Sequence, residues 1–230
     1  MPNQPATRAL HLRPSADLAE RVLLPGDPHS ALAVAQALLD GPKMFNHARG
    51  LWGYTGVADD GEPLTVQSTG LGGPSAAIVC EELIGMGARR LVSIGTATVL
   101  GDGITAGSLL AAETVLVLDG AGTGLAGAQS RLEPDPVLLA RLVEAGATPG
   151  TVASTDLFYD PPLGSLGAVA QDGPLALDLQ ASAILGVAAR RAAEAAVVVG
   201  VTAQDGAPEV SADDLGVRLG EAGYAALRIP

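Results

Sequence analysis

A glycine-rich turn at residues 69–74, "TGLGGP", is the first stretch whose composition suggests chemistry. It lies between an apolar run and a helical pattern. Glycine-rich turns that open a helix often hold a phosphate group through their backbone N–H groups. The same glycines are also expected in a turn that is only a tight corner of the chain. Phosphate binding is therefore a hypothesis that other residues must support.

A second glycine-rich stretch, residues 119–130, contains a formal G-x-G-x-x-G pattern at 122–127. A dinucleotide site needs the third glycine inside a helix and a continuing βαβ unit. Here Pro134 and Pro136 follow soon after, and no strand ends in an acidic residue at the required distance. We therefore expect a mobile surface loop rather than a dinucleotide site.

Other common catalytic patterns are missing from the sequence. The three histidines, His11, His29 and His47, are scattered and have no cysteine or carboxylate cluster beside them, so we expect no metal. There is no Walker motif and no serine in a G-x-S-x-G turn. The single cysteine, Cys80, cannot form an internal disulfide and lies in a helical run, where a buried thiol is expected. We expect no cofactor, with phosphate as the only co-substrate considered.

The charge balance argues against two classes of partner. The chain carries 25 acidic and 13 basic residues, a formal net charge of −12, and its aromatic content is 3%. It therefore lacks both the basic surface and the stacking residues typical of nucleic-acid binding. No apolar run reaches the roughly 18 residues of a membrane helix. Because the first residues also show no apolar secretory segment, we expect a cytoplasmic protein without a nucleic-acid or membrane partner.

The elements that would position a site alternate between apolar strands and helices. With 48% hydrophobic residues among 230, no internal repeat and no long linker, we expect a single domain over residues 1–230. The alternation indicates an α/β fold with a mixed, largely parallel central sheet covered on both faces. We expect strands at 21–27, 89–97, 147–156, 174–180 and 195–203, one or two strands within 108–120, a hairpin around 60–61, and helices at 28–39, 75–86, 136–145, 181–193 and 211–227.

Six blocks in fixed order carry a family resemblance. They read "LLPGDP", "NHARGLWGYTG", "STGLGGPSAAIVCEEL", "RRLVSIGTATVL", "STDLFY" and "LDLQASAILGVAA". From about His11 to the C-terminus, the chain resembles the nucleoside phosphorylases of the purine nucleoside and uridine phosphorylase superfamily. The resemblance implies a central sheet partly closed into a barrel and surrounded by helices. It also implies cleavage of a nucleoside by phosphate, which gives the free base and ribose 1-phosphate.

The resemblance assigns part of a phosphate site to residues that this chain keeps. The backbone amide of Gly26 in the "PGDP" turn and the hydroxyl of Thr96 match phosphate-binding positions. Arg49 in "HARG" matches an arginine that a neighbouring subunit donates.

Two further phosphate-binding positions are arginines in the family and serines here, Ser30 and Ser93. A charge-assisted hydrogen bond contributes about 1.5–3 kcal/mol, so losing two could weaken phosphate binding a hundredfold or more. His29 offers a partial substitute, or it is simply a solvated turn residue. We therefore expect a depleted phosphate site.

The ribose site of the family contains a Glu-Met-Glu motif that reads Asp178-Leu179-Gln180 here. The amide of Gln180 can hydrogen-bond a ribose hydroxyl, but it brings no negative charge to an oxocarbenium-like sugar. Asp178 is the fallback carboxylate, or an acid at a strand edge facing water. The resemblance also implies that Leu179 contacts substrate and that His11 reaches the 5′-hydroxyl in a partner subunit.

The base site fits neither base class cleanly. Phe158 matches the aromatic residue that stacks on the base, and an ordinary core phenylalanine is the alternative. Purine enzymes place an aspartate after the strand "VVVGVT", where this chain reads Ala203, then Gln204 and Asp205. Asp205 either enters the pocket or is a solvated loop acid, and the Gln-x-Arg pair of pyrimidine enzymes is missing. In the turn at residues 69–74, the resemblance implies that the amide of Gly72 lines the pocket wall.

The resulting expectation is nucleoside phosphorolysis, of a purine or a pyrimidine nucleoside, by a protein with a depleted phosphate site. Two alternatives stay open: a nucleosidase in which water replaces phosphate, and a non-catalytic member that binds nucleosides or serves a structural role. Because His11 and Arg49 match residues that serve a neighbour, we expect a homo-oligomer, either a dimer or a hexamer.

Overall fold

The computed structural model describes residues 9–100, 104–159, 175–203 and 211–229. All strands in these ranges belong to one ten-stranded sheet. The strands are β1 (Arg21–Pro25), β2 (Asp40–Asn46), β3 (Gly53–Val57), β4 (Pro63–Gln67), β5 (Arg90–Leu100), β6 (Leu109–Val117), β7 (Arg131–Leu132), β8 (Thr148–Ser154), β9 (Leu175–Asp178) and β10 (Glu194–Ala203). The helices are α1 (Pro28–Leu38), α2 (Gly72–Met86), α3 (Gly120–Ala126), α4 (Pro136–Glu144), α5 (Ala181–Arg191) and α6 (Ala212–Leu227), with a short 3₁₀ helix η1 (Ala48–Gly50).

Five strands close into a barrel. Strand β5 pairs in parallel with β10 and antiparallel with β9. Strand β6 completes the ring, pairing antiparallel with β10 and in parallel with β8, which in turn lies parallel to β9. Strands β1, β4, β3 and β2 extend the sheet outward from β5. The expected mixed sheet that closes partly into a barrel is confirmed.

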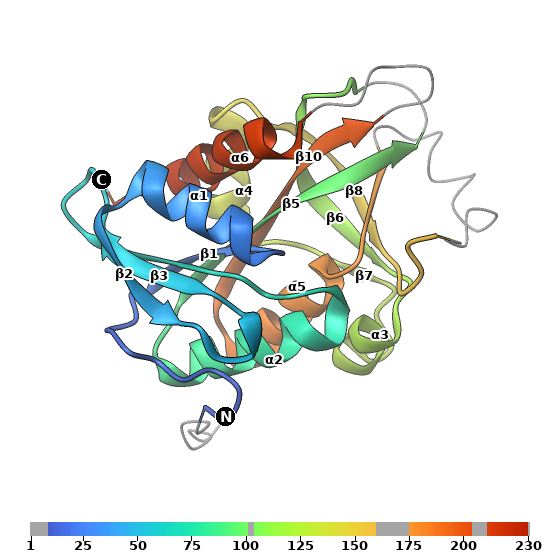
Figure 1. Ribbon diagram of the computed structural model, residues 1–230. Helices are drawn as coiled ribbons and strands as arrows, with labels where there is room; N and C mark the ends of the chain where they lie inside the picture. The colour runs from blue at the N-terminus through green and yellow to red at the C-terminus, as the bar shows by residue number, and fades with distance from the viewer. Residues whose placement is uncertain (1–8, 101–103, 160–174, 204–210, 230) are drawn as a thin grey trace.

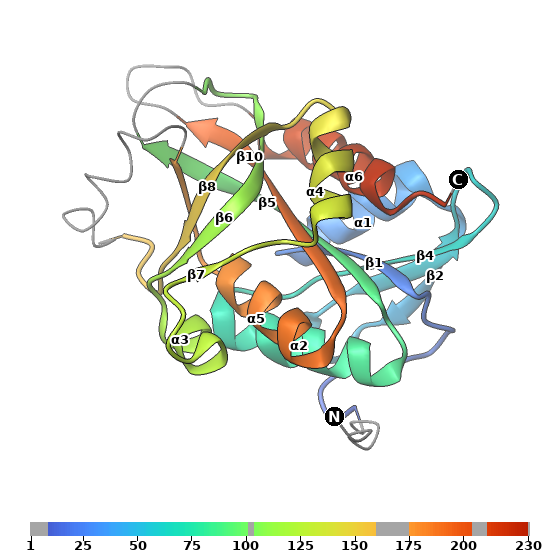
Figure 2. The ribbon, with the colours of Figure 1, turned by 180° about the vertical axis from the view of Figure 1, so that it is seen from behind.

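Helices cover the sheet on two sides. Helices α2, α3 and α5 lie on one side, and α1, α4 and α6 lie on the other (Figures 1 and 2). Two large clusters of buried apolar side chains lie under these helices. In β1, Val22 and Leu24 belong to one cluster and Leu23 to the other, so side chains that alternate along the strand reach both cores. This explains why the strand reads as a continuous apolar run.

The expectation for residues 119–130 is wrong. This stretch forms α3 and leads into β7 instead of a surface loop. Asp119 caps α3 by accepting a 2.7 Å hydrogen bond from the N–H of Gly122. A Cβ atom at Gly122 would lie 2.4 Å from the Oγ atom of Ser182, so this glycine allows α3 to pack closely on α5. Glycines that look like loop signals in the sequence are packing residues here.

Other elements agree with the pattern. Cys80 is fully buried in α2, as expected, and burial raises the pKa of its thiol to about 12. The sequence pattern did not predict strand β2. Five of its seven residues are exposed, so the strand does not read as an apolar run. In the described ranges, no helix is long and apolar enough to cross a membrane.

Candidate active site

A cavity of about 800 Å³ is lined by residues from the ends of β1 and β9, from β5, and from the starts of α1, α2 and α5. Five short segments form much of its wall: 25–27, 70–72, 93–98, 157–159 and 177–180. Strand β1 runs parallel to β5, with Leu24 beside Ser93 and Pro25 beside Ile94. This register brings the turn after β1 next to the second half of β5. The carboxyl ends of neighbouring parallel strands are a common place for ligand binding.

The cavity gathers most of the residues that the sequence singled out. Its described lining includes Gly26, Ser30, Gly72, Ser93, Thr96, Phe158, Asp178, Leu179 and Gln180. The sequence blocks in which they lie are far apart along the chain, and the barrel and its helices bring them together.

The proposed phosphate end has a carboxylate beside it. Asp27 is the N-cap of α1, where its Oδ1 atom accepts from the N–H of Ser30 at 2.9 Å. The hydroxyl of Ser30 donates to Oδ2 of Asp27 at 2.5 Å. Because a hydroxyl has one proton to donate, Ser30 offers only its acceptor lone pairs to a ligand in this arrangement.

The charged side chains of the described lining are Asp27 and Asp178, and this lining includes no lysine or arginine. Ser93, at one of the two expected arginine positions, is only 3% exposed and contributes a neutral hydroxyl. An anion in this part of the cavity would therefore depend on amide and hydroxyl donors, which bind phosphate more weakly than guanidinium groups.

Gln180 is held in one orientation by a buried partner. The hydroxyl of Thr69, a fully buried residue, donates to Oε1 of Gln180 at 3.0 Å. The Nε2 atom of Gln180 faces Gly26, 3.8 Å from the place that a Cβ atom there would occupy. Gln180 thus presents a neutral amide donor beside the turn after β1.

Asp178 caps the start of α5 at the end of β9. Its Oδ1 atom accepts from the hydroxyl of Ser154 at 2.6 Å. Its Oδ2 atom accepts from the N–H groups of Gln180 and Ala181 at 3.0 and 2.8 Å. Burial, supported by the nearby charge of Asp119, raises the pKa of Asp178 to about 6 although these hydrogen bonds oppose the rise. Asp178 therefore lines the cavity while serving as a helix cap.

A buried network continues from Asp178 to α3. The Oγ atom of Ser154 accepts from the N–H of Ser182 at 2.9 Å, and the hydroxyl of Ser182 donates to Asp119. Asp119, 1% exposed, also caps α3. Sequence reasoning missed Thr69, Ser154, Ser182 and Asp119 as supports of the cavity wall. A polar residue that ends an otherwise apolar strand, as Ser154 does, was the available signal.

Two aromatic side chains also belong to the cavity wall. Phe158 and Tyr159 line it and pack edge to face, with ring centroids 5.0 Å apart. Both rings are largely exposed, at 66% and 96%. Phe158 is therefore not an ordinary core residue, and its ring lies where it is accessible to a flat ligand.

Three of the named candidates do not line this cavity in the described part of the chain. His11 binds Glu82 through its ring, with Nδ1 and Oε1 2.7 Å apart. Arg49 is exposed on η1, where its φ is 59°. His29 is exposed on the first turn of α1. Asp205 lies outside the described residues.

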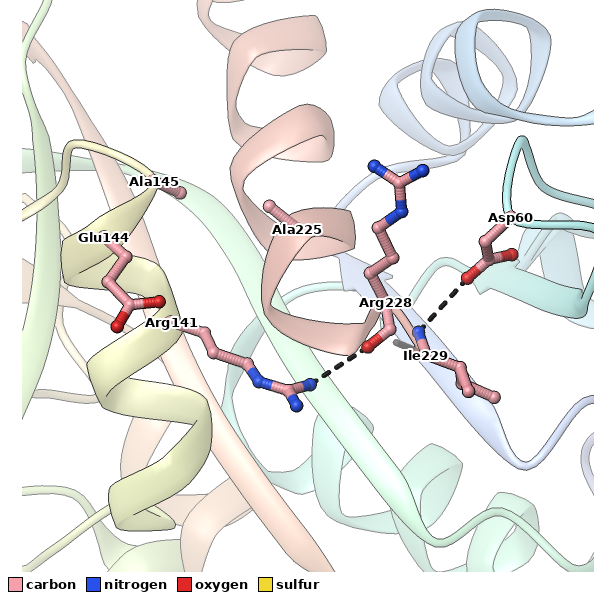
Figure 3. Close-up of a pocket in the computed structure, with 7 residues that line it drawn as sticks. All are labelled: Asp60, Arg141, Glu144, Ala145, Ala225, Arg228 and Ile229. Carbon is pink, nitrogen blue, oxygen red and sulfur yellow. Dashed lines mark hydrogen bonds between the residues drawn. The ribbon is translucent and has the colours of Figure 1, made fainter.

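A second hollow, of about 730 Å³, lies between α4, the end of α6 and the turn after β3 (Figure 3). Three of its four charged residues, all but Glu144, have partners within the fold, and Arg228 lies 3.7 Å from Asp59. Arg141 donates to the carbonyl oxygens of Ala226 and Arg228, at the end of α6. Asp60 accepts from Arg21. This hollow contains none of the residues that the sequence singled out.

Comparison with known protein families shows to which family the chain belongs. The family model of the phosphorylase superfamily matches residues 20–223. The chain belongs to this superfamily. This membership agrees with the barrel and with the place of the cavity in the fold.

Several individual proteins that are similar to this chain are named purine nucleoside phosphorylase DeoD-type. One from Caldanaerobacter subterraneus subsp. tengcongensis is 32% identical over 200 residues, covering 81% of this chain and 83% of the relative. One from Clostridium perfringens strain ATCC 13124 is 31% identical, covering 80% of this chain and 82% of the relative. One from Photobacterium profundum, named DeoD-type 2, is 30% identical, covering 81% and 82%.

Proposed function

We propose that the cavity binds a nucleoside and that phosphate cleaves its N-glycosidic bond, giving the free base and ribose 1-phosphate. The observation that carries this proposal is the gathering of Gly26, Thr96, Gln180 and Phe158 around one cavity in a phosphorylase superfamily fold. The relatives named as purine nucleoside phosphorylases favour a purine base.

The phosphate, the sugar and the ring of the base each have a candidate group. The amide of Gly26 and the hydroxyls of Ser93 and Thr96 donate to phosphate. The amide of Gln180, fixed by Thr69, hydrogen-bonds the sugar. The ring of Phe158 stacks on the base, as its exposure and position at the cavity allow. No cofactor enters this scheme, and phosphate is the only co-substrate.

The proposal includes a contribution from a second copy of the chain. We propose that Arg49 and His11 act in the cavity of a neighbouring subunit, Arg49 on phosphate and His11 on the sugar. In support, neither residue is among the described residues that line the cavity of its own chain. An arginine from a neighbour would be the cation that the described lining lacks.

Hydrolysis is a second candidate, favoured by one observation. The hydroxyl of Ser30 is turned toward Asp27, and the described lining has carboxylates but no basic side chain. Water, unlike phosphate, needs no cation to bind at that end of the cavity.

The deciding experiment incubates the purified protein with inosine, adenosine or uridine, with and without phosphate, and measures released base by chromatography. Release that requires phosphate supports phosphorolysis. Equal release without phosphate supports hydrolysis. Binding in isothermal titration without any release contradicts both and favours a non-catalytic nucleoside-binding protein. The base preference follows from which of the three nucleosides is cleaved fastest.

A further inference from the structure

The two carboxylates that line the cavity are both fixed in place. Asp27 holds the start of α1 through Ser30, and Asp178 holds the start of α5 through Gln180 and Ala181. Neither carboxylate can turn away from the cavity without uncapping its helix. The negative charge on the cavity wall is thus built into the fold.

Helix dipoles offset only part of this charge. A helix N-terminus carries a partial charge of about +0.5, whereas each carboxylate carries −1. Above a pH of about 6, where Asp178 is ionised, the described lining therefore keeps a net negative charge. A uniformly acidic chain, with a net charge of −12, reinforces that potential.

Two aromatic residues of the cavity wall give a second, independent reason to consider a cation. The faces of the exposed rings of Phe158 and Tyr159 attract positive charge. Most of the other described lining residues are glycine, are aliphatic or carry a hydroxyl, as Leu157, Leu177 and Thr202 do. A neutral base is a poor leaving group unless its nitrogen is protonated or its developing charge is stabilised. Apart from Asp27 and Asp178, whose carboxylates already accept hydrogen bonds at the starts of α1 and α5, no described side chain of the cavity lining has a carboxyl, imidazole or amine to do so.

We propose that the cavity selects a nucleoside whose base carries a positive charge, such as a pyridinium or N-alkylated base. This inference rests on the proposed function, because it names the substrate class of the same site. Asp27 and Asp178 attract the charge, and the aromatic rings of Phe158 and Tyr159 receive the base.

A cationic base removes the need for a proton donor. When the C1′–N bond breaks, its electron pair stays on the base nitrogen and cancels the positive charge, so the base leaves neutral. A phosphate oxygen forms the new bond to C1′. A singly positive nucleoside and a hydrogen phosphate dianion give a neutral base and a ribose 1-phosphate monoanion, which balances without a further proton. The positive charge of the substrate also attracts phosphate in the absence of two arginines.

A matched pair of ligands tests the selection by charge alone. Nicotinamide riboside is a pyridinium cation, and benzamide riboside is its neutral analogue of nearly the same shape, with a C–C bond that cannot be cleaved. Isothermal titration above the pKa of Asp178 measures both dissociation constants. We expect the cation to bind on the order of tenfold more tightly. Equal or weaker binding of the cation would overturn the proposal.

Variants that remove the two carboxylates test whether they cause the preference for a cationic ligand. Asparagine also caps helices, so Asp27→Asn and Asp178→Asn remove charge while keeping the cap. Each is expected to reduce the cation-to-neutral affinity ratio about threefold or more. Asp135→Asn is the matched control: Asp135 caps α4 and does not line the cavity, so the ratio stays the same. Circular dichroism checks that each variant is folded, and an unchanged ratio in both cavity variants would contradict the proposal.

Cleavage assays separate this inference from the proposed function. Nicotinamide release from nicotinamide riboside is compared with hypoxanthine release from inosine, with a protein-free blank for spontaneous hydrolysis. A higher kcat/KM for the cation supports the inference. A higher value for inosine overturns it while supporting the proposed function, and would point to an acid such as Asp205 as the proton donor. Cation-selective binding without any cleavage would support the charge selection and contradict the proposed function.

Discussion

The hydroxyl of Ser30 donates to the carboxylate of Asp27 at 2.5 Å, at a position where the family resemblance places an arginine. A residue that would bind phosphate in the family is here a partner of the helix cap. Ser93, the other such position, adds a second neutral hydroxyl to the cavity. The phosphate end of the cavity is consequently the part of the site that differs most from what the resemblance implies.

Restoring the two arginines is expected to restore phosphate binding. The double variant Ser30→Arg/Ser93→Arg should bind inorganic phosphate about tenfold to a hundredfold more tightly than the wild type in isothermal titration. The gain is limited because Asp27 would compete for the new guanidinium at position 30. Gln129→Arg/Ser130→Arg, at two exposed positions outside the described cavity lining, adds the same two charges as a control. No gain in the double variant would show that the two positions were assigned wrongly.

Asp178 is expected to give the folded protein a recognisable pH dependence. Burial raises its pKa from about 4 to about 6, so between these values the folded state binds a proton more readily than the unfolded state. The free energy of unfolding should therefore fall as the pH rises from about 4 to about 6, by at most about 3 kcal/mol from this group. Above pH 6 its contribution stays constant.

Denaturant unfolding of wild type and Asp178→Asn across this pH range isolates the effect. The difference between their unfolding free energies should change between pH 4 and pH 6 and then level off. A difference that is independent of pH would mean that Asp178 titrates normally in the folded protein. Asp135→Asn, at the cap of α4, controls for the loss of a capping carboxylate.

The buried ion pair between Arg21 and Asp60, which lies outside the cavity, is expected to contribute strongly to the free energy of unfolding. Arg21 is 1% exposed and donates to both carboxylate oxygens of Asp60, at 2.5 and 2.6 Å. Asp60→Ala leaves the guanidinium buried without its partner, which should lower the free energy of unfolding by about 3–5 kcal/mol. Asp59→Ala, next to it and 65% exposed, should cost clearly less. Similar losses in both variants would contradict this assignment.

The same ion pair should make the stability of the protein fall in acid. The hydrogen bonds from Arg21 hold the pKa of Asp60 well below its ordinary value, although burial opposes this. The stability that Asp60 contributes is present above about pH 4 and is lost as the pH falls below that value. Wild type should therefore lose more stability than Asp60→Ala on acidification.

Glu82 is expected to hold the segment before β1 in place. Its carboxylate accepts from the N–H groups of Leu10, His11 and Leu12 and lies against the ring of His11. Burial alone would raise its pKa, but these hydrogen bonds lower it overall. Glu82→Gln should speed hydrogen exchange at the three amides, about tenfold for a loss near 1.4 kcal/mol.

Glu81→Gln is the matched control for this segment. Glu81 pairs with Arg191 on α5 rather than with residues 10–12, so its loss should leave exchange at residues 10–12 unchanged. Unchanged exchange in Glu82→Gln would mean that apolar packing of Leu12, rather than the carboxylate, holds the segment.

Mixed oligomers test whether Arg49 serves a neighbour. If Arg49 acts in another subunit's cavity, Arg49→Ala and Gln180→Ala should each lose most base release. Unfolding and refolding the two together should restore part of the activity, since some cavities then combine an intact Gln180 with an intact Arg49 of the neighbouring subunit. Mixtures that never exceed the separate variants would place Arg49 outside the reaction.

Several features followed from the sequence alone. The order of the apolar runs predicts β1, β5, β8, β10 and the helices between them, because strands buried on both faces read as continuous apolar segments. The six blocks of family resemblance name most of the residues around the cavity. They also identify Ser30, Ser93 and Gln180 as neutral replacements, since residue type is a property of the sequence itself.

Only the tertiary structure decided how these groups are used. Thr69 and Gln180 are 111 positions apart, and Ser182 and Asp119 are 63 apart, yet each pair is hydrogen-bonded. Such partners depend on the packing of helices on the barrel, which no local pattern encodes. For the same reason the sequence treated residues 119–130 as a loop, whereas close packing on α5 makes them a helix. The sequence therefore determined which charges the cavity could have, and the fold determined which donors and acceptors remain available to a ligand.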